Sequence, residues 1–342
     1  MHTSKTIFRQ ETSSPSNGAD FKFDFIEASN RLKLVVNRTP LELNYNLSEK
    51  YQANIYFKRE DQQLVRSYKI RGAYNLMSGL TPGQLSSGVV CASAGNHAQG
   101  FAFACKKLGA FGVAFMPLNT PNQKIIQTKR FGQNFISVKL VGHTYDETAV
   151  AAQLYAALNG MKYVHPFDDY KIIEGQGTVG VEILEDLPVI DYIFIPVGGG
   201  GLCSGVGRYF QSVSPKTKII GVEPAGAPSM KAALKAGKPV TLQTIDRFVD
   251  GAAVQRVGDL TFSICREVIS EMHLVPEGKI CSVIRRLYNE EAMVVEPAGV
   301  LSVAALDDYA EKIKGKNIVC IISGSNNDID RLQEINKRAV GC

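Results

Sequence analysis

The chain has 342 residues, enough for two domains around a sizeable core, and its 45% hydrophobic and 21% charged residues are ordinary for a globular protein. The net charge of +5 arises from Lys and Arg residues spread along the sequence, which argues against a nucleic-acid-binding arm and against a basic membrane-binding helix. No apolar run reaches the roughly 20 residues that span a bilayer. Residues 1–20 are polar, so we expect a loose or peripheral segment there rather than a signal peptide.

The predicted elements alternate between helices and short apolar strands. In the first half, the expected order begins with helix 24–36, strand 55–58, helix 69–77, a turn at 81–83, strand 89–92 and helix 98–108. It continues with strand 113–116, a helix with Pro121 at its first position, strand 135–141, helix 144–160 and strand 163–164. The second half continues with helix 178–185, strand 192–197, helix 201–210, strand 218–223, helices 230–236, 260–269, 280–289 and 298–309, and strand 317–322. This alternation predicts an α/β fold of two doubly wound domains with mainly parallel sheets, each covered by helices on both faces.

Cysteine and histidine usage indicates neither disulfides nor a metal site. The seven cysteines are scattered and form no C-x-x-C pair: Cys91, Cys105, Cys203, Cys265, Cys281, Cys320 and Cys342. We expect reduced thiols in the core of a cytoplasmic protein. The five histidines form no H-E-x-x-H motif, so no metal is expected.

The sequence around Lys69 is electrostatically unusual. It follows a strand-like run and opens a helical pattern, with Ser67 as the expected N-cap, so Lys69 falls in the positively polarised first turn. Arg66 and Arg71 add positive charge, and this crowding would lower the pKa of the Lys69 amine. An amine with a lowered pKa can attack a carbonyl and form a Schiff base. The alternative is an ordinary solvated lysine.

Four consecutive glycines, Gly198, Gly199, Gly200 and Gly201, separate a buried strand from a helix that begins near Leu202. Several backbone N–H groups can converge on one anion in such a loop, and the helix dipole adds to the attraction. The spacing matches neither a P-loop nor G-x-G-x-x-G, so a phosphate is indicated without a nucleoside triphosphate or a dinucleotide. A tight turn that permits close helix–sheet packing is the alternative.

Two further strand-to-helix loops carry small polar residues. Ser93, Gly95 and His97 belong to Ser93-Ala94-Gly95-Asn96-His97, which suits a carboxylate at a helix N-terminus, although Ser93 could simply cap the helix and His97 could be structural. Ser323 follows the last strand and could contact a ring nitrogen, or it could belong to a serine turn. An activated lysine, a phosphate cradle and a carboxylate loop together indicate pyridoxal 5′-phosphate, a phosphate-bearing aldehyde that lysine can hold.

These motifs also carry a family resemblance. Ser67-Tyr68-Lys69-Ile70-Arg71-Gly72-Ala73, the loop from Ser93 to Gly100, Gly198 to Leu202, and Ser323-Gly324 occur in the same order as in the fold-type II (tryptophan synthase β-like) pyridoxal-phosphate enzymes. The sequence resembles the threonine dehydratases (threonine ammonia-lyases) of that family from about residue 24 onward. In that fold we expect a large cofactor-binding domain of residues 1–85 and 166–342, and a small domain of residues 86–165.

The resemblance implies a role for each motif. Lys69 would hold the cofactor as a Schiff base and would later remove the proton at Cα. Asn96 would bind the ring hydroxyl, Gly198 to Leu202 would bind the phosphate, and Ser323 would face the pyridine nitrogen. Ser93, Gly95 and His97 would surround the substrate carboxylate. Because serine cannot hold the ring nitrogen protonated as a carboxylate would, the ring is a weaker electron sink, which favours β-elimination.

The resemblance also implies an activity and suggests alternatives. The expected reaction is deamination of L-threonine to 2-oxobutanoate and ammonia, the first step of isoleucine biosynthesis, with weaker action on L-serine, in a homodimer or homotetramer. The alternatives are a serine dehydratase or racemase, a cysteine synthase, a diaminopropionate ammonia-lyase, or a non-catalytic module that binds a phosphate ligand.

Three departures from related enzymes narrow this interpretation. Serine racemases of this fold resemble Ser-Ser-Gly-Asn-His at the second loop, whereas this chain has Ala94, so little racemisation is expected. Some relatives bind a divalent cation near the position of Glu223 through a second acidic residue, and here that position is Ser229. The sequence from Asn326 to Arg338 resembles the lead-in to a regulatory ACT-like domain that senses isoleucine. We expect that domain to be absent, and no isoleucine inhibition through it.

Overall fold

The computed structural model describes residues 22–339, so the expectations for residues 1–20 and for Cys342 lie outside the described residues. Within the described residues, no helix is long and apolar enough to cross a membrane. The six described cysteines are buried and unpaired, as predicted.

The larger sheet has six strands in the order β1-β2-β10-β7-β8-β9. The strands are β1 (Leu41–Leu43), β2 (Asn54–Arg59), β7 (Tyr192–Pro196), β8 (Lys218–Pro224), β9 (Glu271–Val275) and β10 (Asn317–Ile322). All neighbours are parallel except β1, which pairs antiparallel with β2. Because β2, β10 and β7 are adjacent and parallel, their carboxyl ends meet at one edge, where ligands bind in such sheets.

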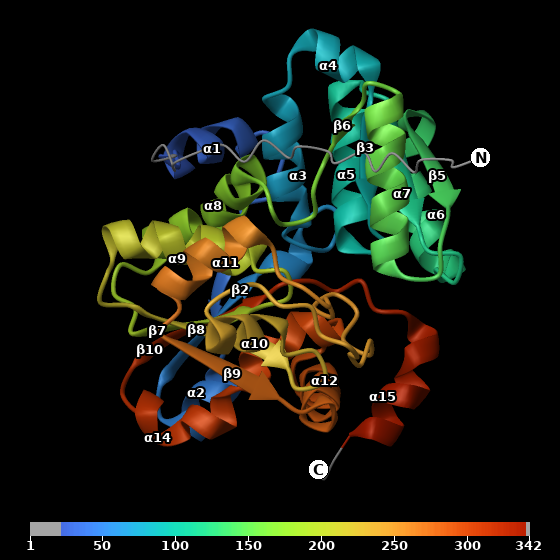
Figure 1. Cartoon of the computed structure of the whole chain (residues 1–342). Coiled ribbons are helices and arrows are strands. Elements are labelled where there is room, and N and C mark those ends of the chain that lie inside the picture. Colours follow the sequence, from blue (N-terminus) through green and yellow to red (C-terminus); the bar gives the residue numbers. More distant parts are fainter. Residues whose placement is uncertain (1–21, 340–342) are drawn as a thin grey trace, which may run out of the picture.

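The smaller sheet is fully parallel, with the order β5-β4-β3-β6. Its strands are β3 (Val89–Ala92), β4 (Gly112–Met116), β5 (Ile136–Leu140) and β6 (Lys162–Tyr163), and Figure 1 shows it above the larger sheet. The segment that forms this sheet thus lies between Val89 and Tyr163, inside the range proposed for the small domain. The domain boundaries themselves stay a prediction.

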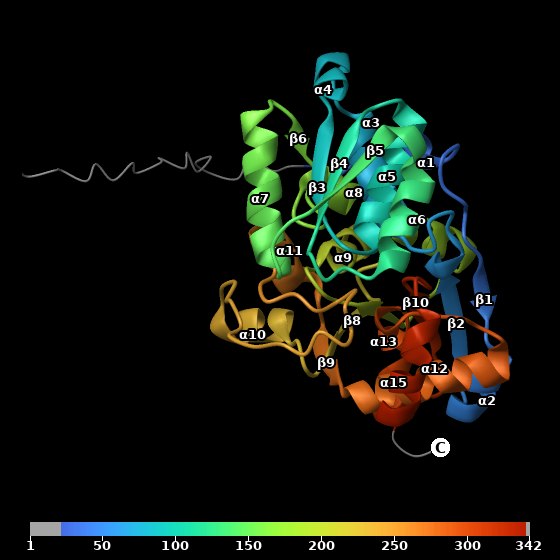
Figure 2. The ribbon, with the colours of Figure 1, turned by 90° about the vertical axis from the view of Figure 1, so that its right-hand side faces the viewer.

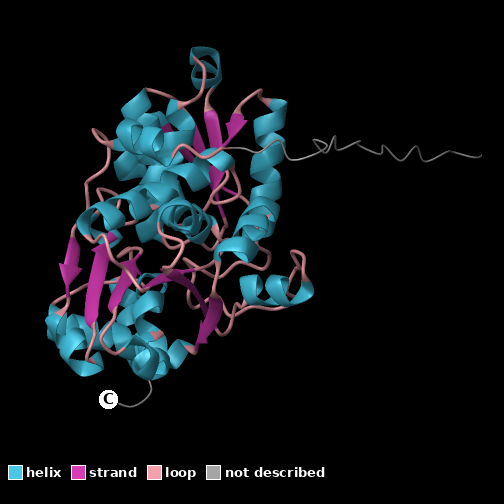
Figure 3. Cartoon of the chain, turned by 90° about the vertical axis from the view of Figure 1, so that its left-hand side faces the viewer, coloured by secondary structure: helices cyan, strands magenta, loops and turns pink. Residues whose placement is uncertain are grey.

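Helices cover both faces of each sheet, as the apolar strands predicted (Figure 2 and Figure 3). In the larger sheet, Phe194 and Ile220 pack toward α2 (Tyr45–Tyr51), α12 (Glu277–Glu291) and α13 (Leu301–Ala304). Ile193 and Ile195 pack on the other face toward α1 (Phe25–Leu32), α8 (Tyr170–Asp186), α9 (Gly201–Val213), α10 (Ser229–Ala236) and α11 (Asp259–Val268). In the smaller sheet, α3 (Lys69–Ser78), α5 (Asn96–Leu108) and α6 (Asn122–Gly132) lie on one face and α7 (Tyr145–Leu158) on the other.

Helix α3 connects the two units because it packs against both α8 and α5. The contact with α5 is made at Gly100, where an added Cβ would lie 2.9 Å from the backbone nitrogen of Ile70 and 3.0 Å from the carbonyl carbon of Lys69. Only glycine allows the two helix backbones to approach this closely. The first turn of α3 is therefore fixed against α5.

The structure corrects several element predictions. The expected turn at Thr81 is the capped start of a short helix, α4 (Pro82–Ser87). Pro121 is the N-cap of α6 rather than its first helical residue, and α8 starts at Tyr170, well before the predicted 178. The helix predicted over 298–309 is broken into short 3₁₀ and α turns, ahead of α14 (Ala310–Ile313). The pattern missed β1, α2, β9 and α15 (Leu332–Arg338), four elements of eight residues or fewer.

Candidate active site

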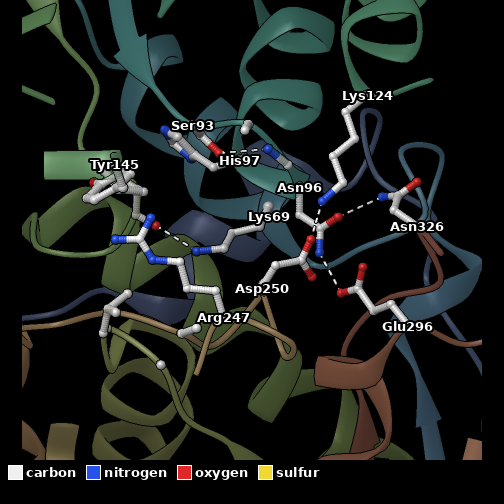
Figure 4. Close-up of a pocket in the computed structure, with 18 of the residues that line it drawn as sticks. Lys69, Ser93, Asn96, His97, Lys124, Tyr145, Arg247, Asp250, Glu296 and Asn326 are labelled. Carbon is white, nitrogen blue, oxygen red and sulfur yellow. Dashed lines mark hydrogen bonds and ion pairs between the residues drawn. The ribbon is translucent and has the colours of Figure 1, made fainter. Parts of the chain in front are cut away.

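A cavity of about 400 Å³ lies at the carboxyl edge of the larger sheet, within the size range of small-ligand sites. It brings together nearly every residue that the sequence singled out: Lys69, Ser93, Gly95, Asn96, His97, Gly198, Gly199, Gly200, Gly201 and Leu202 all line it. Figure 4 shows Lys69 reaching into the cavity between the loop that carries Ser93 and the side chains of Asp250 and Glu296.

Lys69 is the first residue of α3 and is half-buried at the cavity wall. Its ammonium donates a hydrogen bond of 2.8 Å to the carbonyl of Pro166, and it has no ion pair among the described residues. Burial lowers the pKa of Lys69 to about 8, although the carboxylate of Glu296 acts in the opposite direction. The amine is therefore partly neutral near physiological pH, as a nucleophile or a base requires.

The predicted lowering of the Lys69 pKa is confirmed, but its predicted cause is wrong. Burial acts on Lys69, whereas Arg71 is neutralised by the carboxylates of Glu60 and Glu182 on the far side of α3. The predicted N-cap is also wrong. Tyr68 occupies that position, and the buried Oγ of Ser67 has no hydrogen-bond partner in the described chain.

The glycine loop after β7 presents backbone donors to the cavity. Thr261 Oγ1 donates 2.7 Å to the carbonyl of Gly199, and the N–H of Ser204 donates 2.8 Å to that of Gly200. In a trans peptide, the C=O and the N–H point in opposite directions. The N–H groups of Gly200 and Gly201 belong to the same two peptides as these carbonyls, so they point away from Thr261 and Ser204. Among residues 22–339, none of the N–H groups from Gly198 to Cys203 has an acceptor.

Gly200 is the residue of this loop that requires glycine most clearly. Its φ of +94° lies in the left-handed region, and an added Cβ would lie 2.8 Å from Cε of Met230. The loop ends where α9 begins, so its unpaired N–H groups add to the positive end of that helix. This arrangement is an anion-binding site of the kind that holds phosphate.

The loop after β3 forms a second site with unpaired donors. Ser93 Oγ accepts the N–H of Gly95 at 3.2 Å, and Gly95 is the N-cap of α5. The N–H groups of Asn96, His97 and Ala98 have no acceptor in the described part of the chain. Three free donors at the start of a 13-residue helix suit a carboxylate.

His97 is held neutral beside this loop. It is 2% exposed, and its Nε2 donates 3.0 Å to the carbonyl of Val164, which leaves Nδ1 as an unprotonated and unpartnered nitrogen. Burial, followed by the positive charge of Lys69, lowers the pKa of His97 to about 3. A neutral imidazole fixed in one tautomer can orient a ligand but cannot act as a cation.

Asn96 belongs to a polar chain that the sequence revealed only in part. Its Nδ2 donates 2.6 Å to Glu296, and its Oδ1 accepts 2.8 Å from Asn326. Burial, and then the charge of Asp250, raises the pKa of the Glu296 carboxyl to about 7. Glu296 was missed, although an acidic residue between the apolar run at 293–295 and a proline was a usable signal.

Ser323 is the one predicted cofactor residue outside the cavity wall. It is 3% exposed, and its Oγ donates 3.3 Å to the carbonyl of Ala298, while its own carbonyl accepts the N–H of Tyr68. It therefore lies directly behind the start of α3. Its predicted contact with a ring nitrogen stays a prediction.

Glu223 acts as a helix cap. Its carboxylate accepts the N–H groups of Met230 and Lys231 at 2.6 and 3.0 Å, and Ser229 bonds to the carbonyl of Val254. Burial raises the pKa of Glu223 to about 8. Within residues 22–339, no group of three His, Cys, Asp or Glu residues could hold a metal ion.

The family model described as "pyridoxal-phosphate dependent enzyme" matches residues 32–324, which is most of the chain. The chain belongs to this family. The biosynthetic L-threonine dehydratase IlvA of Halalkalibacterium halodurans is 53% identical over 318 residues, which cover 93% of this chain and 77% of the relative.

Solved structures agree with this assignment. The processed form of threonine deaminase isoform 2 from Solanum lycopersicum has a TM-score of 0.86 at 43% identity, covering 92% of this chain and 93% of that one. Maize serine racemase also reaches 0.86, at 31% identity, covering 92% and 96%. The predicted fold class, two doubly wound, mainly parallel α/β units of fold type II, is confirmed.

The cavity fits the cofactor of this pyridoxal-phosphate dependent enzyme on two observations. Unpaired N–H groups from Gly198 to Cys203 match a phosphate, and an amine with a lowered pKa in the same cavity matches an aldehyde. Lys69, Asn96 and the glycine loop through Leu202 would hold the group.

Proposed function

We propose that this enzyme deaminates L-threonine to 2-oxobutanoate and ammonia by eliminating the β-hydroxyl, with weaker action on L-serine, as the first step of isoleucine biosynthesis. One observation carries the proposal. The Lys69 amine, with its pKa lowered to about 8, shares a cavity with two sets of unpaired backbone donors. The identity of 53% to a threonine dehydratase supports the choice of substrate.

The start of α5 binds the substrate carboxylate in this proposal. The N–H groups of Asn96, His97 and Ala98 donate to it, and the neutral ring of His97 packs beside it without adding charge. This contact would fix the orientation of Cα, because a carboxylate held by several donors has little freedom to rotate.

Lys69 moves the proton. When bound, pyridoxal 5′-phosphate supplies the electron sink for negative charge at Cα. The Lys69 amine, while free, takes the proton from Cα, and a pKa of about 8 suits this exchange near neutral pH.

Elimination rather than racemisation is supported by Ala94. Racemisation needs a group that delivers a proton to the opposite face of Cα, and Ala94 lines the cavity with a methyl group that cannot carry one. We therefore expect almost no D-serine from L-serine, and appreciable D-serine from the purified protein would contradict this expectation.

The test compares substrates in the purified protein. Release of 2-oxo acid from L-threonine should exceed release from L-serine, with one ammonia formed per 2-oxo acid. No 2-oxo acid from either substrate, in protein that carries the cofactor, would refute the proposal. A product formed only with an added thiol nucleophile would identify a cysteine synthase instead.

Two further properties belong to the proposal. Six buried, unpaired cysteines are consistent with a reducing compartment, so we place the enzyme in the cytoplasm. We also propose a homodimer or homotetramer, which light scattering would distinguish from a monomer.

A further inference from the structure

Arg247 is the cation in the cavity wall that has no partner among the described residues. Among the other lining cations, Lys69 bonds to the Pro166 carbonyl, Lys124 pairs with Asp250, and Arg331 pairs with Asp250 at 3.5 Å. Arg247 has no hydrogen bond or ion pair to any residue from 22 to 339. Arg247 is exposed, so its planar guanidinium is free to pair with an anion that enters the cavity.

The backbone that carries Arg247 is held in place although it lies in neither a helix nor a strand. On one side, Asp246 donates its N–H to the Gly226 carbonyl at 2.8 Å, and its carboxylate pairs with Arg338. On the other side, Phe248 is 4% exposed in the core, and its carbonyl accepts from Arg331 at 2.6 Å. The polar groups of the two neighbouring residues are thus bonded to other parts of the protein, and the side chain of Arg247 is left free to reach the cavity.

The direction of the side chain indicates which anion it serves. Figure 4 shows the guanidinium of Arg247 directed toward the side of the cavity where Tyr145 lies, away from Asp250 and Glu296. Ser93 and His97, at the start of α5, also lie on that side of the view. The glycine loop, in contrast, offers a phosphate a set of unpaired backbone donors of its own.

We propose that Arg247 is a second contact for the substrate carboxylate, which it grips bidentately from the large sheet while the N-terminus of α5 donates from the small one. The carboxylate then joins the two units of the enzyme. The inference rests on the proposed function, because it takes an α-amino acid as the ligand. Arg247 would thus select for a free carboxylate, and esters or amides of the same amino acid would bind poorly.

Asp146 is the competing partner. It lines the same cavity at the start of α7, is exposed, and has no hydrogen bond or ion pair within the described chain. An Arg247–Asp146 pair formed when the two units approach would use the guanidinium without any substrate contact. The experiment must therefore separate a ligand contact from an internal pair.

The test changes the protein and the ligand in turn and compares the effects of the two changes. Dissociation constants are measured by calorimetry on the cofactor-loaded enzyme. The probe is L-2-aminobutanoate, which lacks the β-hydroxyl and cannot undergo its elimination. It is compared with its amide, in which a neutral carboxamide replaces the carboxylate. In Arg247→Gln, the dissociation constant for the acid should rise about 10- to 100-fold, the range for a charged hydrogen bond, and that for the amide less than about 2-fold. Arg247→Lys should recover only part of the loss, because an ammonium lacks the planar fork.

Three controls complete the design. Arg256→Gln, in the same segment but paired with Asp259 outside the cavity, should change neither dissociation constant. Equal changes for acid and amide, or none, would overturn the proposal, as would an Asp146→Asn variant that reproduces the pattern of Arg247→Gln. A loss confined to pyridoxal 5′-phosphate affinity would reassign Arg247 to the phosphate. Threonine turnover by the unaltered enzyme tests the proposed function separately.

Discussion

Lys69 and Arg71 stand two residues apart at the start of α3, and their surroundings are opposite. Arg71 is fully buried and holds two carboxylates bidentately, Glu60 at 2.8 and 2.8 Å and Glu182 at 2.7 and 2.9 Å. Lys69 faces the cavity with one carbonyl as its partner. Burial opposes the charge of both, but in Arg71 the carboxylates outweigh it and raise the pKa, whereas in Lys69 burial prevails and lowers the pKa to about 8.

The difference shows how one helix turn serves two purposes. The cluster around Arg71 also includes Lys58, which is fully buried and bonds to Glu182 at 2.6 Å. This cluster ties α3 to β2 and α8, so the position of the helix does not depend on the reactive amine. Lys69 can therefore remain without an ion pair to any described residue, and chemically available, on a helix that other charges hold in place.

The largest effect should come from Lys69→Ala. Release of 2-oxo acid from threonine should fall by about 10³-fold or more, because the base and the attachment point for the cofactor are both lost. The free energy of unfolding in urea should fall by no more than about 1 kcal/mol, since only one hydrogen bond is removed. Residual activity above a few per cent would contradict the assignment of Lys69.

Arg71→Met should have the reverse signature. Removing the guanidinium leaves Glu60 and Glu182 with too little positive charge in a buried setting, and the free energy of unfolding should fall by about 3–5 kcal/mol. The matched control is Arg38→Met. Arg38 pairs with Glu185 and Asp186 at the surface, and its loss should cost no more than about 1 kcal/mol. Equal losses in the two variants would show that the buried cluster does not anchor α3.

The pH dependence of stability should show the lowered pKa of Lys69. The folded-state pKa of Lys69, about 8, is below its unfolded value of 10.5, so between these pH values the unfolded chain binds the extra proton. The stability of the cofactor-free protein relative to Lys69→Met should therefore rise with pH across this window, by about 3 kcal/mol. Urea unfolding at several pH values would measure it, and a flat difference would refute a lowered pKa.

Glu296→Gln should alter the same pH dependence of stability, by a smaller amount. Glu296 raises the pKa of Lys69, so its removal should move the start of the alkaline window below pH 8. Glu296 itself has a folded-state pKa of about 7 against 4.5 unfolded. Its contribution to stability is full below pH 4.5 and is lost as the pH rises through 7, and the difference between the unaltered protein and the variant should fall across that range. An unchanged alkaline window would show that Glu296 does not act on Lys69.

The sequence predicted the parts of this site that follow from strand-to-loop spacing. Strands β3 and β10 were predicted to the residue, and Lys69, Asn96 and the glycine loop meet in one cavity as expected. Carboxyl ends of parallel strands share an edge, so residues placed just after such strands come together without knowledge of tertiary detail.

The parts that were not predicted depend on contacts across long sequence separations. The pairing of Arg71 with Glu60 and Glu182 is invisible to local spacing, and Arg71 was therefore given the wrong electrostatic role. Arg247 lies in a segment without periodicity, so only the tertiary structure shows that it reaches the cavity. The start of α8 was missed because Gly175 and Gly177 interrupt its helical pattern, although both are buried in helix contacts.

Gly100 positions the amine of Lys69 although it lies outside the cavity wall. A methyl group at this point of α5 would press on the backbone of Lys69 and Ile70, and because a main chain cannot rotate aside as a side chain can, α3 would have to slide. The amine would then leave its place beside the glycine loop. In a genetic selection for cells that need this enzyme, we expect position 100 to tolerate as little variation as position 69, although Gly100 takes no direct part in the chemistry.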